Sequence, residues 1–173
     1  MTRIGVIGLG YWGPNYARVL HELGRAELVW ACDARPEALD LMRTRYPGVK
    51  LSTDAEELVS DPSLEAIVVA TPTSTHAELT TAALVAGKHV LCEKPLAFTV
   101  EECDQAIDAA EDAGRILMVG HTFIFNPAVR RMKELVGDGA IGGIRYCHAA
   151  RTGLGPIRQD VNALWDLAPH DVS

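Results

Sequence analysis

The sequence predicts an α/β fold: a doubly wound parallel sheet, followed by the start of a second α/β domain that is cut short. Three observations lead to this prediction. Six short apolar segments alternate with helical patterns up to about residue 120, and strands that alternate with helices form parallel sheets. The glycine-rich run GDGAIGG at 137–143 then breaks the alternation. One strand pattern and one helix pattern follow, too few to enclose a core of their own.

The first half of the chain contains three strand–helix units. A helix is expected to begin near Pro14 and to stop at Gly24, because proline is favoured in the first turn and glycine after the last. Pro36 opens the second helix, and Thr53 with Glu56 forms a capping box for a brief third one. The expected strands are 3–8, 26–32 and 49–52.

The second half continues the alternation. A helix over 75–86 is closed by Gly87, and another begins at the capping box of Thr99 and Glu102 and ends at Gly114. The expected strands are 65–70, 88–92 and 115–120, the first of which is almost uniformly apolar, as a strand covered on both faces should be.

The last fifty residues differ in pattern. Asn126 and Pro127 are typical of an N-cap and first helical residue for a helix to about 136. A strand of mixed polarity is expected at 144–151 and a helix within 161–173. The expected division is therefore a first domain at 1–122, then a linker helix and the incomplete second domain at 123–173.

Composition excludes several classes of partner. The chain has 173 residues, is 48% hydrophobic and carries a net charge of −7 with no Lys/Arg block, which argues against nucleic acid or an anionic membrane. We find no signal-peptide pattern and no apolar run near the roughly 18 residues of a spanning helix, so we expect a cytoplasmic protein. No metal-site spacing links the cysteines, which we expect to be buried and reduced: Cys32, Cys92, Cys103 and Cys147.

The run GLGYWG at 8–13 satisfies the GxGxxG pattern between a strand and a helix. Asp33 follows Gly13 by twenty residues, at the end of the second strand, where a carboxylate can accept ribose hydroxyls. Together these features predict a dinucleotide site at a helix N-terminus. The loop residues expected to line it are Gly8, Gly10, Tyr11, Trp12 and Gly13.

The same region bears on the choice between NAD and NADP. The Asp33 carboxylate would repel a 2′-phosphate, which favours NAD. Arg35 could instead pair with that phosphate, or could simply be a solvated residue before the next helix. We expect NAD, with NADP as the less favoured cofactor.

Two further loops leave the carboxyl ends of strands beside the expected switch point: ATPTSTH at 70–76 and CEKP at 92–95. Lys94 therefore points to the cofactor crevice, and Pro95 restricts its backbone to extended geometry. A positioned catalytic ammonium and an ordinary exposed lysine are both compatible with these residues alone.

The segments GVIGLGYWG, VVATPTSTHAELTTAALVAGKHVLCEKPLA and WDLAPHD together resemble the Gfo/Idh/MocA oxidoreductases, over essentially the whole chain. The resemblance implies an N-terminal Rossmann domain, an incomplete C-terminal domain, and hydride transfer between a nicotinamide and a secondary alcohol. The family's lysine falls on Lys94, and its Asp-x-x-x-His pair on Asp166 and His170. His170 would be the acid/base and Lys94 the donor to the reacting oxygen. Without the resemblance, Asp166 and His170 would be a helix-surface ion pair, and Pro169 predicts a distorted helix.

The resemblance adds further site residues. Cofactor contacts are expected from Thr71, Pro72, His76 and Glu93, although His76 could cap a helix and Glu93 could pair with Lys94. Residues expected on the substrate side are His121, Asn126, Arg151, Arg158 and Asn162. The stretch RTGLGPIRQDVNALWDLAPHD resembles members such as the UDP-N-acetylglucosamine and UDP-N-acetylglucosaminuronate 3-dehydrogenases. Arginines there would suit a diphosphate or carboxylate. A structural loop held by salt bridges is the alternative for the arginines, and an N-cap is the alternative for Asn126.

These observations predict an NAD-dependent oxidoreductase that acts on a secondary alcohol of a sugar or nucleotide-sugar, a homo-oligomer in its full-length form. The alternatives are an inositol or free-sugar dehydrogenase and, from another class, a non-catalytic NAD-binding module such as a redox sensor or truncated remnant.

Overall fold

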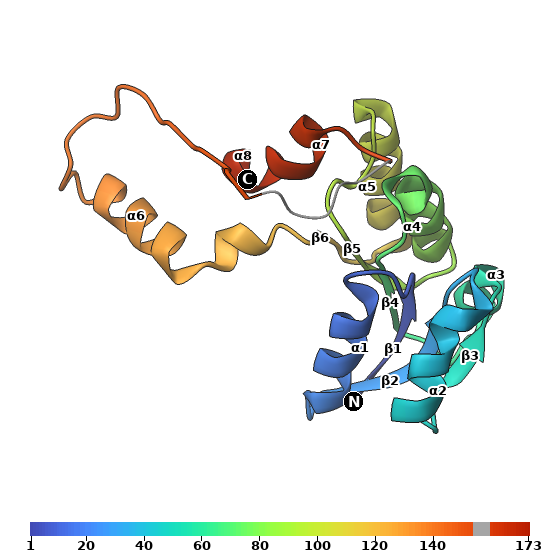
Figure 1. The fold of residues 1–173 in the computed structure, drawn as a ribbon. Coiled ribbons are helices and arrows are strands. Elements are labelled where there is room, and N and C mark those ends of the chain that lie inside the picture. The colour runs from blue at the N-terminus through green and yellow to red at the C-terminus, as the bar shows by residue number, and fades with distance from the viewer. Residues whose placement is uncertain (154–159) are drawn as a thin grey trace. The chain divides into compact units, whose positions relative to one another are not determined.

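The computed structural model describes residues 1–153 and 160–173 (Figure 1). The chain forms two compact units, Met1–Val119 and Gly120–Ser173, which are described separately. The division lies close to the domain boundary that we predicted after residue 122.

The first unit is built on one six-stranded sheet in the order β3-β2-β1-β4-β5-β6, with every neighbouring pair parallel. This order reverses direction between β1 and β4, where ligands bind in doubly wound folds. The predicted fold class is confirmed. The strands are β1 (Thr2–Ile7), β2 (Ala26–Cys32), β3 (Lys50–Ser52), β4 (Ala66–Val69), β5 (His89–Cys92) and β6 (Leu117–Val119).

Helices cover both faces of the sheet, and each face has its own hydrophobic core. Successive strand residues such as Val6 and Ile7 belong to opposite cores, because side chains alternate along a strand. One core contains buried residues of α1 and α2, the other contains buried residues of α3, α4 and α5. The helical elements are α1 (Gly13–Glu22), η1 (Pro36–Ala38), α2 (Leu39–Arg45), α3 (Ala55–Ser60), η2 (Thr73–Thr75), α4 (His76–Val85) and α5 (Val100–Ala113).

Helix ends follow the predicted signals with one correction. Helix α5 has the predicted capping box of Thr99 and Glu102, and Gly114 closes it in the left-handed region. The capping box predicted for α3 is wrong, because the N-cap is Asp54. Asp54 Oδ1 accepts from the backbone N–H of Glu56 at 2.9 Å. The Asp54 carboxylate therefore caps the helix in place of the Thr53 hydroxyl, which lies one residue earlier.

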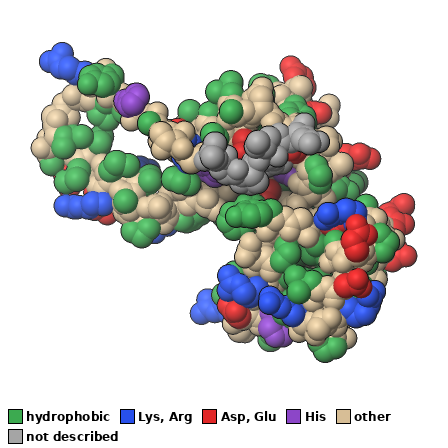
Figure 2. All heavy atoms as spheres, in the orientation of Figure 1, with side chains coloured by type: hydrophobic (Ala, Val, Ile, Leu, Met, Phe, Trp, Pro, Cys, Tyr) green, Lys and Arg blue, Asp and Glu red, His purple; other side chains and the backbone are tan. Residues whose placement is uncertain are grey.

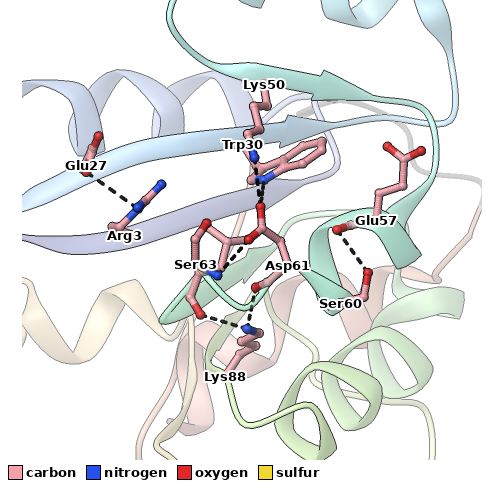
Figure 3. Close-up of polar contacts among 10 residues, drawn as sticks. Arg3, Glu27, Trp30, Lys50, Glu57, Ser60, Asp61, Ser63 and Lys88 are labelled. Atoms are coloured by element: carbon pink, nitrogen blue, oxygen red, sulfur yellow. Dashed lines mark hydrogen bonds and ion pairs between the residues drawn. The ribbon is translucent and has the colours of Figure 1, made fainter.

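The turn before β4 forms a polar hub (Figure 3). The Asp61 carboxylate accepts from Trp30 Nε1 at 2.7 Å, the Ser63 backbone N–H at 2.7 Å and Lys50 Nζ at 3.1 Å. Lys88, which is buried just before β5, donates to two backbone carbonyls of the same turn at 2.7 and 2.9 Å. Hydrogen bonds from Ser63, and then from Trp30, hold the pKa of Asp61 well below its usual range. The hub joins β2 and β3 to the amino ends of β4 and β5.

The second unit contains short helices. Asn126 is the predicted N-cap of α6, its Oδ1 accepting from the Ala128 backbone N–H at 2.9 Å. Hydrophobic side chains are exposed on the second unit (Figure 2). Met132 of α6 and Ile141 of the segment after it are among the exposed ones. The elements are η3 (Thr122–Phe125), α6 (Pro127–Gly137), α7 (Ala163–Leu167) and α8 (Pro169–Val172).

One prediction for this unit is wrong. Residues 144–151 form no strand, and nearly all of them are exposed. A strand needs a partner for its backbone groups, and no described residue pairs with this segment. The helix predicted within 161–173 is present as two short helices, α7 and α8, which meet at Ala168. The distortion predicted from Pro169 is found there, because Pro169 has no N–H with which to continue the first helix.

The cysteines divide by position. Cys32 and Cys92 are buried as predicted, whereas Cys103 is half-buried and Cys147 is exposed. Cys147 lies in the segment predicted as a strand, so the missing pairing also explains its exposure. Within the described ranges, no helix has the length and apolar character to cross a bilayer, and no group of three or more His, Cys, Asp or Glu could hold a metal ion.

Candidate active site

The glycine loop connects β1 to α1 at the switch point of the sheet. Gly8 has φ +94°, and a Cβ on it would lie 2.5 Å from the Ala70 carbonyl at the end of β4. A Cβ on Gly13 would lie 1.9 Å from the Gly8 oxygen. A side chain at Gly8 or Gly13 would therefore clash with the protein's own backbone, whether or not a ligand is bound. Gly10 differs, because a Cβ there would meet nothing within 4 Å.

The two aromatic residues of the loop, Tyr11 and Trp12, are 75% and 47% exposed. Their rings contact each other edge to face at 5.7 Å between centroids. Neither ring belongs to a hydrophobic core, so both are available beside the N-terminus of α1.

Asp33 ends β2 and contacts the glycine loop directly. Its Oδ2 accepts from the Leu9 backbone N–H at 2.8 Å and from Arg35 Nη2 at 3.2 Å. Its Oδ1 accepts from the Arg35 backbone N–H at 2.9 Å and from Arg35 Nε at 3.0 Å. Burial by itself raises the pKa of Asp33, but the bonds from Arg35 and Leu9 outweigh it, so this pKa lies below its usual range.

The loop after β5 carries Glu93 and Lys94, both of them buried. The Glu93 carboxylate accepts from the Tyr16 hydroxyl at 2.6 Å and from the Lys94 backbone N–H at 3.1 Å. The Lys94–Pro95 peptide bond is cis. Tyr16 lies on α1, so the helix that begins at the glycine loop is bonded to the lysine loop. Burial, and then the bond to Glu93, raises the pKa of Tyr16.

The role of Tyr16 was not predicted from the sequence. The available signal was its position one turn into the helix after the glycine loop, where a polar ring can reach a neighbouring loop of the same sheet edge.

The loop after β4 carries Thr71 and Pro72. The Thr75 hydroxyl donates to Thr71 Oγ1 at 2.8 Å and lies 2.9 Å from the Pro72 carbonyl oxygen. The His76 ring is buried, with Nδ1 2.8 Å from the Pro95 carbonyl oxygen and Nε2 2.9 Å from the Thr71 carbonyl oxygen. His76 does not cap α4, because Thr75 occupies that N-cap position. His76 is the C-cap residue of η2 through its backbone N–H, while its ring contacts two loops.

Arg151, one of the residues predicted on the substrate side, has its partners within the second unit. Arg151 donates to both carboxylate oxygens of Asp171 at 2.9 and 2.7 Å, and its guanidinium lies 4.7 Å from the ring centroid of Phe123. The hydrogen bond from Arg151 lowers the pKa of Asp171. The Phe123 ring in turn lies 4.8 Å from the ring of His170. Arg151 therefore holds α8, which carries His170, against η3.

The remaining predicted residues divide by role. Asn162 caps α7 by accepting from the Trp165 backbone N–H at 3.1 Å, and Asn126 caps α6. His121 is half-buried directly before η3, and Asp166 lies in α7. Arg158 lies outside the described residues.

Comparisons with known proteins agree with this geometry. The family GFO_IDH_MocA, an oxidoreductase family with an NAD-binding Rossmann fold, matches residues 2–121. The chain belongs to this family. The Gfo/Idh/MocA match covers the glycine loop, Asp33 and the lysine loop, so the predicted resemblance is confirmed for the first unit.

Several relatives have described activities. The chain is 38% identical over 140 residues to the myo-inositol 2-dehydrogenase of Thermotoga maritima, which covers 81% of this chain and 42% of that protein. It is 36% identical over 148 residues to the 2,7-anhydro-N-acetylneuraminate hydratase of Mediterraneibacter gnavus, covering 86% and 39%. The chain therefore spans about two fifths of the length of these relatives.

Solved structures have the same architecture. The crystal structure of GenD2 from gentamicin A biosynthesis, in complex with NAD, matches with a TM-score of 0.76 at 32% identity, covering 80% of this chain and 40% of that one. A probable dehydrogenase from Thermotoga maritima matches with a TM-score of 0.75 at 38% identity, covering 81% and 42%.

Proposed function

We propose that these residues form the cofactor site and catalytic lysine of an NAD-dependent oxidoreductase that acts on a secondary alcohol of a sugar or nucleotide-sugar. One observation carries the proposal: the glycine loop is bonded to Asp33 through Leu9, and its helix is bonded to the lysine loop through Tyr16 and Glu93. Both links lie at the carboxyl edge of the sheet, beside the switch point.

The residues present fit a dinucleotide. The open space over Gly10 would admit a pyrophosphate to the backbone, and α1 begins three residues later with its free N–H groups. Asp33 would hold the adenosine ribose, and Thr71 and Pro72 would lie toward the nicotinamide. When bound, the nicotinamide supplies the acceptor for the hydride.

The buried Asp33 carboxylate supports NAD over NADP, and Arg35 acts on the same carboxylate. A buried carboxylate repels a 2′-phosphate, and this carboxylate already accepts four N–H bonds, three of them from Arg35. A carboxylate has about four lone-pair sites, so ribose hydroxyls would displace the Arg35 side chain. We infer that Arg35 competes with the ribose and thereby weakens NAD binding.

The protein's own groups account for the proton. His170 would take the proton of the substrate hydroxyl, since an imidazole can do so near neutral pH. Lys94 would donate a hydrogen bond to the same oxygen and stabilise its developing negative charge. Asp166 would orient the imidazole or bind a second hydroxyl.

An inositol or free-sugar dehydrogenase is the second candidate. Four relatives are named as inositol dehydrogenases. Arg151, one of two arginines expected to bind a diphosphate, is bonded to Asp171. Both facts favour an uncharged polyol. The candidate from another class is an NAD-binding module without turnover.

Reduction of NAD or NADP, followed by absorbance at 340 nm, tests these candidate functions. The substrates offered are a panel of nucleotide-sugars, free sugars and inositols. The protein should be produced from its complete gene, with Lys94→Ala as the test variant and the exposed Lys133→Ala as control. Reduction of NAD by one class of alcohol, lost only in Lys94→Ala, supports the proposal and names the substrate class. NADH binding with no turnover on any alcohol favours the non-catalytic module. Light scattering and cell fractionation test the expected homo-oligomer and its cytoplasmic location.

A further inference from the structure

His76 occupies an unusual position between the two loops of the candidate site. Its ring is only 1% exposed and fills the space between the loop after β4 and the loop after β5. Nδ1 lies 2.8 Å from the Pro95 carbonyl oxygen, and Nε2 lies 2.9 Å from the Thr71 carbonyl oxygen. Pro95 follows Lys94 directly, so one side chain connects the lysine loop to the loop expected near the nicotinamide.

Both partners of the ring are backbone carbonyls, which accept hydrogen bonds and cannot donate them. A neutral imidazole has one N–H and one lone pair, so it could make only one of these contacts as a hydrogen bond. The other contact would place a nitrogen lone pair against a carbonyl oxygen at less than 3 Å. Both contacts are hydrogen bonds only when both ring nitrogens carry a proton.

We propose that His76 is a positioning residue that is protonated on both ring nitrogens and holds the Lys94 loop to the Thr71 loop by two hydrogen bonds. The proposal rests on the proposed function only where it treats these loops as parts of a cofactor site. Burial and the positive end of α4 work against a charge here, and the two carbonyl dipoles aimed at the ring favour it.

The ionisable groups on the elements that meet at the ring are few. Glu78 lies in the first turn of α4, and Glu93 and Lys94 lie in the loop after β5. The loop from Ala70 to Thr75 contains none. Two carboxylates and one ammonium therefore lie on these elements, and of the two carboxylates Glu78 is exposed and Glu93 accepts from Tyr16.

The first test is spectroscopic and needs no ligand. Long-range ¹⁵N–¹H correlation spectra of the histidine rings in the chain should give protonated shifts for both nitrogens of His76 at pH 7, with His76→Gln used to assign the signal. The exposed His148 gives a matched reference. A ring with one N–H and one bare nitrogen would overturn the proposal.

The second test measures positioning. His76→Asn keeps a donor near the position of Nδ1, His76→Gln keeps one near Nε2, and His76→Leu keeps neither. We expect NADH binding, followed by nicotinamide fluorescence, to weaken by about tenfold in His76→Leu for one or more lost buried hydrogen bonds, with partial rescue in the two amide variants. Circular dichroism confirms that each variant is folded, and His148→Gln should bind as the parent does.

The outcomes separate the two proposals. NADH binding that is unchanged in a folded His76→Leu protein would overturn the positioning role, whatever the spectra give. If the parent itself does not bind NADH, the proposed cofactor site fails, and the ¹⁵N spectra still decide whether the ring makes both bonds.

Discussion

Gly10 offers a way to change ligand binding without changing the fold. An alanine Cβ at Gly10 would meet nothing within 4 Å, and Gly10 is not among the glycines with positive φ. Gly10→Ala should therefore leave the free energy of unfolding unchanged or raise it by about 0.4–1 kcal/mol, because alanine restricts the unfolded chain. A pyrophosphate in contact with this backbone would meet the new methyl group. Overpacking of that kind costs about 1–3 kcal/mol, or roughly 5- to 150-fold in the Kd of NADH.

Gly13→Ala is the matched contrast. Its Cβ would lie 1.9 Å from the Gly8 carbonyl oxygen, so the backbone must move by about 1 Å before the contact becomes tolerable. This variant should lose about 1–3 kcal/mol of unfolding free energy and bind NADH weakly as well. Thermal unfolding by circular dichroism gives the first quantity, and titration of nicotinamide fluorescence gives the second.

The comparison has a clear refuting result. If Gly10→Ala binds NADH with the Kd of the parent protein, no pyrophosphate contacts this backbone and the proposed cofactor site is wrong. If Gly13→Ala has the same free energy of unfolding as the parent, the conclusion that Gly13 packs too closely against Gly8 for a side chain is wrong.

Three further predictions follow from contacts in the first unit and from one exposed thiol. Arg35→Ala should bind NADH several-fold more tightly and NADPH no more tightly, which fluorescence titration of both cofactors measures; equal gains for both would contradict competition at Asp33. Hydrogen bonds from Ser63 and Trp30 lower the pKa of Asp61, so its contribution to stability is complete above the ordinary value near 3.9 and is lost as pH falls through the lowered pKa. Urea unfolding from pH 6 to pH 3 should therefore show a flatter loss of stability in Asp61→Asn than in the parent. Burial raises the pKa of Cys32 and Cys92 to about 12, so the exposed Cys147 should react first with a thiol reagent at pH 8, and Cys147→Ser should remove that fast phase.

The sheet could be predicted because its signals are local. Short apolar runs, proline and glycine at helix ends, and the capping box of Thr99 each act within a few residues. The GxGxxG loop and Asp33 were predictable for the same reason, since their spacing along the chain determines their meeting at the sheet edge. The prediction of a strand at 144–151 was wrong because a strand needs a neighbouring strand to pair with. The local sequence pattern does not show whether such a partner is present.

Side-chain roles were harder to predict where they depend on distant parts of the chain. Tyr16 meets Glu93 across 77 residues, and the His76 ring meets Pro95 across 19. For Arg151 the sequence left open a substrate contact and a structural salt bridge; the structure shows a pair with Asp171, a partner that no spacing rule indicates. In each case the fold places a residue that is distant in sequence next to the side chain. The residue type alone is compatible with several roles, so the sequence could not identify the partner.

The contacts of the first unit also separate stability from function. At the carboxyl edge, Asp33 is bonded to Leu9, Glu93 to Tyr16, and His76 lies against both Thr71 and Pro95, so four loops are held together before any ligand binds. Prearranged loops of this kind reduce the ordering that a ligand must bring about. The Asp61 hub holds the amino ends of β4 and β5 in a similar way (Figure 3). The bonds of Asp61 to Trp30, Lys50 and Ser63 involve none of the four loops at the carboxyl edge. Loss of a bond at the carboxyl edge should therefore change NADH affinity more than stability, whereas loss of a bond in the Asp61 hub should change stability more than affinity.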